Sequence, residues 1–269
     1  MAIKFAGRGS SIVLADLDEE KLAQATAKVA ALGVPAWGFA VDVTNPASIA
    51  AFKSQVDAEA GPIDVLVNNA GVVFGGPFTK TPLDDHFKTY EVNTLGLVAM
   101  THAFLDDMVA RPEAHLVNIA SASGFIGLPY GSSYASSKWA AIGFSESIRA
   151  ELNVEGHKHV HVTIVCPSYI GTGMFKGAEA PKATQILEPD FIAEKVVEAV
   201  EHNSVYVKEP WMVKITPLLR ELLPTSLYDQ ISHLFGADTS MARWTGRRGK
   251  AEPEPQEQTA SSDQPEAER

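Results

Sequence analysis

Hydrophobic and polar positions along the chain follow two different periods that alternate. Short apolar runs rich in β-branched residues predict buried strands, whereas the stretches between them place apolar residues at helical spacing. Short continuous apolar strands separated by helices are typical of a parallel sheet that is covered on both faces. With right-handed crossovers, this order predicts a doubly wound parallel sheet in a three-layer α/β/α arrangement. The predicted strands are 11–15, 36–41, 65–68, 115–120 and 161–166, and the predicted helices are 19–32, 46–60, 83–110 and 134–155.

The carboxyl-terminal part of the chain has a different pattern. From residue 246 it is rich in Pro, Glu, Gln and Ser and nearly free of apolar residues, which predicts a disordered tail over 246–269. We therefore expect one domain over residues 1–245. The elements predicted late in that domain are a helix at 189–202, a strand at 205–207, and two leucine-rich helical stretches at 217–223 and 225–235.

Composition excludes several classes of protein. The length suits one larger domain, and no apolar run approaches the roughly 18 residues needed to span a bilayer. The first residues lack the basic start and apolar stretch of a secretory signal, so we expect a cytoplasmic protein. The net charge of −11 argues against nucleic acid as a partner.

Cysteine and histidine usage points away from disulfide and metal chemistry. The single cysteine, Cys166, excludes an internal disulfide, and its apolar surroundings predict a small buried core residue. His157, His159 and His161 alternate into a predicted strand and do not share a helix face. We therefore expect no metal site.

A Tyr-x-x-x-Lys pattern is the most informative local feature. Tyr134 and Lys138 are four residues apart in a predicted helix and therefore lie on one face of it. A cation placed there would lower the pKa of the tyrosine from its ordinary value of about 10 and make it a usable acid/base. The pair alone could also be an ordinary surface pair. Ser121, thirteen residues upstream at the end of a predicted strand, and Asn93, within a predicted helix, favour the chemical interpretation.

These residues and several others, in order along the chain, resemble the short-chain dehydrogenase/reductase family. The resemblance implies a Rossmann-like fold and the transfer of a hydride between NAD(H) and an alcohol, ketone or aldehyde. A homodimer or homotetramer is implied too. The segments that carry the resemblance are 11–16, 41–43, 68–71, Asn93, Ser121, Tyr134 with Lys138, and 167–172.

The family also implies roles for the four polar residues. Tyr134 would be the general acid/base, and Lys138 would lower its pKa and hold the nicotinamide ribose. Ser121 would hydrogen-bond the substrate oxygen, and Asn93 would anchor a water that relays protons to Lys138. Two other interpretations stay open. Ser121 could be a strand-end serine like its neighbour Ser123, and Asn93 could bond the backbone from within its helix.

The cofactor residues are likewise implied by the resemblance. An acid at the end of a strand, here Asp16, accepts hydrogen bonds from the adenosine ribose and repels a 2′-phosphate, which favours NAD over NADP. The alternative is a helix N-terminal acid, a position that Asp18 shares. The remaining segments are Asp42 with Val43 at the adenine, Asn69, Ala70 and Gly71 beside the adenosine ribose, and Pro167, Ile170 and Thr172 at the carboxamide. The family usually has a glycine after this proline, where Ser168 stands here.

One family segment is absent from the start of the printed sequence. The family opens with a strand and a Gly-x-x-x-Gly-x-Gly turn that binds pyrophosphate at a helix N-terminus. Residues 1–6 resemble the end of the helix that follows this turn, and Gly7 and Gly9 resemble a helix stop. We expect an N-terminally truncated fold with a start assigned inside the first helix. A chain that begins at Met1 is expected to be poorly stable or deficient in cofactor binding, because the loss of a central strand would leave backbone groups of its two neighbours unpaired.

Substrate identity must come from residues 172–245, the expected lid and carboxyl-terminal helices. We expect residues 173–176, with Met174 and Phe175, and the leucine-rich helical stretches to supply a lid and an apolar pocket. This region resembles the retinol dehydrogenase and 17β-hydroxysteroid dehydrogenase branch, which implies a bulky apolar alcohol or ketone such as a retinoid, steroid or lipid. The leucine-rich stretches could instead be core, an oligomer contact or a membrane-surface face, the last favoured by the basic residues Arg243, Arg247, Arg248 and Lys250. Two alternative functions stay open: an NADP-linked 3-oxoacyl reductase, and an SDR-fold binding or scaffold protein without catalysis.

Overall fold

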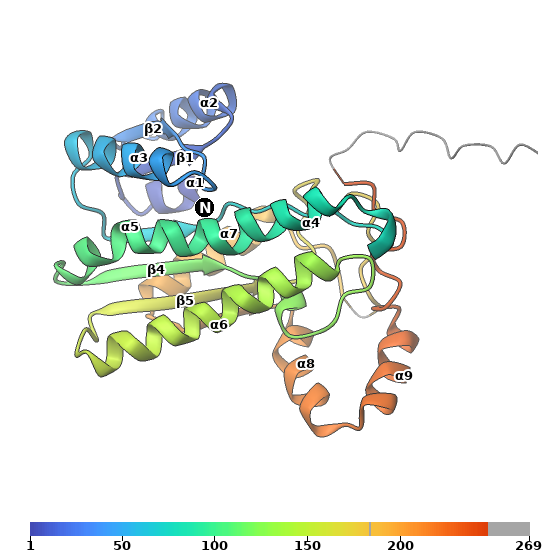
Figure 1. Cartoon of the computed structure of the whole chain (residues 1–269). Coiled ribbons are helices and arrows are strands. Elements are labelled where there is room, and N and C mark those ends of the chain that lie inside the picture. Colours follow the sequence, from blue (N-terminus) through green and yellow to red (C-terminus); the bar gives the residue numbers. More distant parts are fainter. Residues whose placement is uncertain (183, 247–269) are drawn as a thin grey trace, which may run out of the picture.

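The computed structural model describes residues 1–182 and 184–246, and within them all strand pairs are parallel (Figure 1). β1 (Ile12–Asp16) pairs with β2 (Ala36–Ala40) in a two-stranded sheet. A four-stranded sheet has the order β3 (Val65–Asn68), β4 (Ala114–Ile119), β5 (Val160–Pro167) and β6 (Tyr206–Glu209). The predicted strands are confirmed to within one or two residues at their ends.

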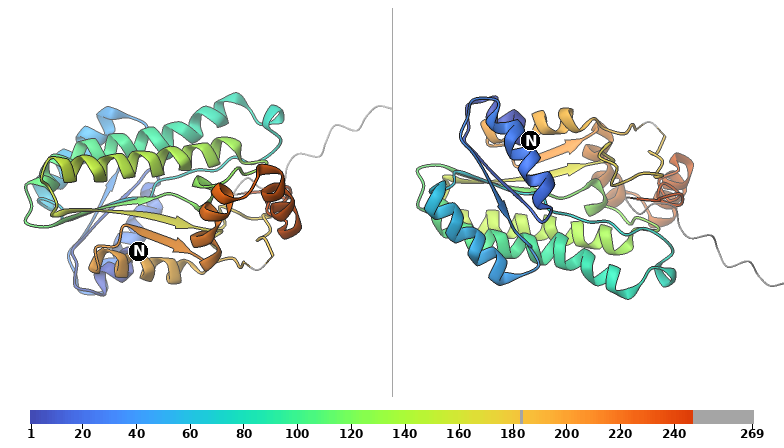
Figure 2. Two further views of the ribbon diagram at one scale, coloured as in Figure 1. Left: turned by 90° about the horizontal axis from the view of Figure 1, so that it is seen from below. Right: turned by 90° about the horizontal axis from the view of Figure 1, so that it is seen from above.

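Helices cover both faces, so the predicted three-layer arrangement is confirmed (Figure 2). Apolar residues of the first face form the largest core cluster, which includes Phe52, Phe104 and Leu116. Val117 and Val165 point to the opposite face, where they pack with Val196. The first face is covered by α3 (Pro46–Glu59), α5 (Leu97–Val109) and α6 (Ser132–Val154), and the second by α1 (Ala2–Ala6), α2 (Glu19–Ala30) and α7 (Pro189–Glu201).

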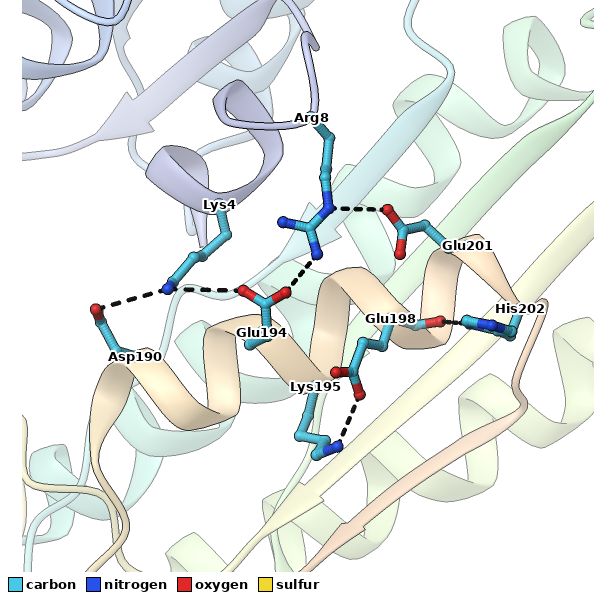
Figure 3. A network of polar contacts seen from close by, with 8 residues as sticks. All are labelled: Lys4, Arg8, Asp190, Glu194, Lys195, Glu198, Glu201 and His202. Carbon is cyan, nitrogen blue, oxygen red and sulfur yellow. Dashed lines mark hydrogen bonds and ion pairs between the residues drawn. The ribbon is translucent and has the colours of Figure 1, made fainter.

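The hydrogen-bonded sheet is interrupted between β1 and β3, as the sequence led us to expect. Neither strand has a backbone partner on the edge that would face a central strand, within the residues that the structure describes. The two sheets are joined through helices instead. Phe5 of α1 packs beside the cluster of the four-stranded sheet, and Lys4 and Arg8 form ion pairs with Glu194 of α7 (Figure 3). Arg8 also reaches Glu201, with Nε to Oε1 at 3.1 Å.

Local signals at the helix ends behave as predicted. Asn45 caps α3 by accepting hydrogen bonds from the backbone of Ala47 and Ser48, directly before a first-turn proline. Gly7 ends α1, and Gly9 follows with a φ of 88°, which a residue without a Cβ adopts readily.

Two helices differ from the prediction. The stretch predicted as one helix over 83–110 consists of α4 (Leu83–Tyr90), a π-helical segment (Glu91–Gly96) and α5. The helix predicted to begin at Pro217 is α8 (Trp211–Leu222), which begins two turns earlier and contains the proline. The stretch was predicted from the helical spacing of its leucines, which begins only at Leu218. Val213, buried against the core, anchors the true first turn.

α8 and α9 (Thr225–Phe235) form a hairpin that projects from the body (Figure 1). α9 contributes no buried residue, and Leu218 and Leu222 of α8 are 59% and 71% exposed. The interpretation of this stripe as ordinary core is therefore wrong. Among the described residues, no helix combines the length and apolar character needed to cross a membrane. The predicted tail after residue 246, with Arg247, Arg248 and Lys250, lies outside the described residues.

Candidate active site

The carboxyl end of β4 and the first turns of α6 bring the predicted proton-transfer residues together. Ser121 follows β4 and is buried, and Tyr134 of α6 is 5% exposed. Burial raises the pKa of the Tyr134 hydroxyl to about 12, because the phenolate would lose its hydration, while a hydrogen bond with the Ser121 side chain opposes the rise. The Ser121 hydroxyl also accepts hydrogen bonds from the backbone N–H and the hydroxyl of Ser123.

Lys138 lies one turn further along α6 and is buried beside the tyrosine. Its Nζ is 5.8 Å from the centre of the Tyr134 ring and donates a 2.8 Å hydrogen bond to the carbonyl of Ile119. Burial lowers the pKa of this ammonium group to about 8. The sequence led us to expect that Lys138 lowers the pKa of Tyr134. In the described arrangement desolvation outweighs any such effect, and the pKa of the tyrosine is raised.

Asn93 lies in the π-helical segment and holds the loop after β3. Its Oδ1 accepts from the Val72 backbone N–H at 2.8 Å, and its Nδ2 donates to the Val72 carbonyl at 2.9 Å. Nδ2 also donates to the hydroxyl of Ser137 on α6. The Asn93 side chain thus does bond backbone groups. These groups belong to Val72 in the loop after β3 and not to its own helix. A π-helical segment inside a longer helix is frequently found at functional sites.

Gly71, in the loop after β3, lies beside both Asn93 and Lys138. A side chain there would begin 3.4 Å from Asn93 Oδ1 and 3.7 Å from Lys138 Nζ. The predicted residues Asn69, Ala70 and Gly71 are thereby placed in the loop that passes over Asn93 and Lys138. The loop leaves space beside the ammonium group at Gly71, because this residue has no side chain.

The two acids at the end of β1 have different surroundings. Asp18 caps α2 by accepting a hydrogen bond from the Lys21 backbone N–H at 3.1 Å. Asp16 ends the strand, is exposed, and accepts one hydrogen bond from the Asp18 backbone N–H at 3.0 Å. Helix capping is therefore the task of Asp18, and the carboxylate of Asp16 remains accessible to a ligand.

Asp42 and Val43, which follow β2, are partly engaged in the protein itself. The Asp42 carboxylate accepts hydrogen bonds from the backbone N–H and the hydroxyl of Thr44, which lower its pKa. Val43 lies against Gly96 of the π-helical segment so closely that a side chain at Gly96 would collide with it. These contacts connect the two-stranded sheet to the helix that carries Asn93.

The segment after β5 leads over the site. Pro167 ends the strand, and Ile170 forms an isolated parallel bridge with Leu187. Thr172 is exposed, and its backbone N–H donates to the Ile170 carbonyl at 2.8 Å. Cys166, in the same strand, has no exposed surface, which confirms it as a core residue.

An apolar cluster from the predicted lid and from the segment after α9 packs around Tyr134. The ring of Phe175 contacts the Tyr134 ring edge-to-face with centroids 5.6 Å apart, and Tyr169 contacts Phe175 at 5.1 Å. Met241 and Trp244 belong to the same cluster. We expected both residues 173–176 and the leucine-rich helices to supply a lid and an apolar pocket. Met174 and Phe175 do lie in the cluster, whereas the leucines of α8 and α9 do not. Met241 and Trp244 were missed, because single large residues show no period.

A buried polar network behind the site was also missed. Asn68 Nδ2 donates to both Thr101 Oγ1 and Asn118 Oδ1 at 2.9 Å, and Asn118 Nδ2 donates to Ser145 Oγ at 2.9 Å. The network ties β3, β4, α5 and α6 together. Asparagine within an apolar strand is the sequence signal that could have revealed it, because such an amide needs buried partners.

Comparison with known proteins agrees with this geometry. Residues 1–183 match the family model described as short chain dehydrogenase. The chain is 35% identical over 228 residues to human epidermal retinol dehydrogenase 2, covering 83% of this chain and 74% of the relative. It is 33% identical over 221 residues to human 17-beta-hydroxysteroid dehydrogenase 13, covering 82% and 73%.

A solved structure shows the same arrangement. The short-chain dehydrogenase/reductase from Burkholderia phymatum in complex with NAD superposes with a TM-score of 0.75 at 25% identity, covering 84% of this chain and 88% of that one. Together with the assembled Ser121, Tyr134 and Lys138, these matches show that the chain belongs to the NAD(P)-dependent short-chain dehydrogenase/reductase family of oxidoreductases.

Proposed function

We propose that this oxidoreductase interconverts a bulky apolar alcohol and its ketone or aldehyde, with NAD preferred over NADP. The observation that carries the proposal is the position of Tyr134, whose hydroxyl shares a hydrogen bond with Ser121 inside an apolar cluster. An apolar wall around a proton donor suits a substrate whose single polar group is the reacting oxygen. The named activities of the retinol and hydroxysteroid dehydrogenase relatives support this substrate class.

The chain's own residues supply position and the proton. Ser121 would donate or accept a hydrogen bond at the substrate oxygen, while Tyr134 would exchange a proton with that oxygen. Lys138, with its pKa lowered to about 8, would provide a positive charge next to the tyrosine and bind ribose hydroxyls. Asn93 would hold the loop after β3 in place over Lys138. When bound, the nicotinamide cofactor accepts or supplies the hydride.

The described residues fit the cofactor at both of its ends. Gly71 leaves space beside the Lys138 ammonium group, where the nicotinamide ribose would bind. At the other end, Asp16 offers an exposed carboxylate with one local hydrogen bond, which would accept further hydrogen bonds from the adenosine ribose and repel a 2′-phosphate. We propose NAD preference on this basis. A glycine-rich phosphate turn is not found among the described residues, since helix α1 begins at Ala2.

Calorimetry and NADH absorbance with the full-length protein test this proposal. We expect NAD to bind more tightly than NADP, and NADH to accumulate with retinol or a 17β-hydroxysteroid but not with short hydrophilic alcohols. Turnover that favours 3-oxoacyl substrates with NADPH would overturn it in favour of the reductase alternative. A folded protein that binds neither cofactor would support a binding or scaffold function.

A further inference from the structure

The segment 237–246 returns from α9 to the catalytic end of the molecule (Figure 1). Met241, in the middle of this segment, is 1% exposed. It packs in the apolar cluster that contains Tyr134, Val73 and Leu128. A methionine buried this deeply beside the proposed acid/base forms part of the wall of the site.

Trp244 closes the same wall on its outer side. Its ring lies against Gly75 in the loop after β3, where a side chain would begin 2.8 Å from the ring. Its Nε1 donates a 3.0 Å hydrogen bond to the carbonyl of Met174 in the loop after β5. The tryptophan therefore bridges the two loops that border the cluster around Tyr134.

Backbone hydrogen bonds fasten the segment to the loop after β5. The N–H of Thr245 donates to the Lys176 carbonyl, and the N–H of Glu179 donates to the Ser240 carbonyl, both at 2.8 Å. The hydroxyls of Ser240 and Tyr169 are 2.8 Å apart. Gly177 has a φ of 83°, and a side chain there would collide with the carbonyl of Arg243. The two segments thus form one continuous cover.

We infer that this cover, through Met241 and Trp244, determines the size of the substrate that the site accepts. The inference rests on the proposed function and assigns its specificity to residues outside the predicted α8 and α9 stripe. A methionine side chain is unbranched and adapts to an irregular apolar surface, so its volume sets the space beside the reacting oxygen. Leu218 of α8, in contrast, is exposed and lies outside the cluster that contains Tyr134.

The test compares Met241→Ala with Met241→Phe in the full-length protein. For each variant, kcat/KM is measured with NAD for secondary alcohols of increasing size, up to a 17β-hydroxysteroid. We expect the ratio of the largest to the smallest substrate to rise by about tenfold or more in Met241→Ala and to fall in Met241→Phe, since one methylene group in an apolar pocket changes kcat/KM by roughly 10- to 200-fold. The KM for NAD should stay unchanged.

Leu218→Ala is the matched control, because it removes an apolar side chain from the exposed hairpin; its substrate ratio should equal that of the wild type. A loss of stability alone would not move the ratio in opposite directions in the two Met241 variants. If Met241→Ala does not fold, the inference is tested by Met241→Phe alone, in which the ratio of the largest to the smallest substrate should fall. Unchanged ratios in a protein that turns over alcohols would overturn the inference. Absence of any alcohol turnover by the wild type would instead overturn the proposed function.

Discussion

The two sheets of this protein differ in what holds their functional residues. At the four-stranded sheet, Ser121 after β4 and Tyr134 and Lys138 of α6 are buried, and the polar network of Asn68 and Asn118 lies behind them. The two-stranded sheet ends in Asp16, which is exposed and makes a single local hydrogen bond. The groups proposed to move the proton are therefore fixed by the protein's own packing, whereas the group proposed to select the cofactor is exposed and would gain most of its contacts from the ligand.

The connection between the two sheets shows the same contrast. Around the core the rings of Phe39, Phe52 and Phe104 contact one another edge-to-face, with centroids 6.3 and 5.7 Å apart. On the opposite face the link consists of Phe5, which packs beside the cluster of the four-stranded sheet, and of partly exposed ion pairs of Lys4 and Arg8 with Glu194 (Figure 3). We therefore expect changes beside the four-stranded sheet to affect catalytic turnover. Changes at the two-stranded sheet should affect the preference between NAD and NADP and the contact between the two sheets.

The largest effect is expected from Tyr134→Phe. General acid/base catalysis contributes typically 10²- to 10⁴-fold, so kcat/KM should fall by about that factor. The ring would still pack against Phe175, and the melting temperature should change little. NADH absorbance and a circular dichroism melt measure the two quantities. Full turnover in this variant would refute the proposed role of the tyrosine.

Lys138→Met should separate stability from catalysis. The pKa of Lys138 falls from 10.5 to about 8 on burial, so the unfolded state binds its proton more tightly than the folded state. The buried charge therefore lowers the free energy of unfolding of the wild type by about 3 kcal/mol below pH 8. This reduction disappears as the pH rises from 8 to 10.5. The variant should be more stable by up to that amount at pH 7, and inactive.

Urea unfolding at pH 7 and at pH 10 measures this difference. We expect the advantage of Lys138→Met over the wild type to shrink at the higher pH. If the difference in the free energy of unfolding is the same at pH 7 and pH 10, packing and not the buried charge causes the difference in stability between the two proteins.

The residues that could be predicted from the sequence are those with a local geometric signal. Tyr134 and Lys138 share a helix face because of their spacing. Asn45 followed by a proline marks a helix start, and its side chain caps α3. The π-helical segment at Asn93 could not be predicted, since it depends on contacts with Val72 and Val43 from distant loops. Strand positions were predicted well because continuous apolar runs have few other uses in a covered parallel sheet.

The carboxyl-terminal region shows the limit of periodic patterns. The leucines of α8 and α9 have the spacing of a helix face that is buried, yet the hairpin leaves many of them exposed. Met241 and Trp244 have no period, yet they belong to the cluster around Tyr134. Helical spacing identifies an apolar face, but contacts between distant segments decide whether that face is covered.

Asp16→Ser sharpens the comparison at the cofactor end. Removal of the carboxylate should lower the preference for NAD over NADP by roughly 10- to 100-fold in kcat/KM, because the ribose loses its acceptor and the 2′-phosphate is no longer repelled. Asp18→Ser is the control, since serine also caps helices and Asp18 is engaged with α2. An equal change in cofactor preference in both variants would contradict the assignment of this role to Asp16.

The smallest effect is expected from Glu194→Gln. This change removes the carboxylate through which α7, on the four-stranded sheet, pairs with Lys4 and Arg8. Exposed ion pairs are weak and are screened by salt, so the melting temperature should fall slightly at low ionic strength and match the wild type in concentrated salt. Glu198→Gln is the matched control, because Glu198 pairs with Lys195 on the same helix (Figure 3). If the melting temperatures of the two variants fall equally, the ion pairs of Glu194 do not help to hold the two sheets together. The aromatic contacts around Phe52 would then hold the sheets together without them.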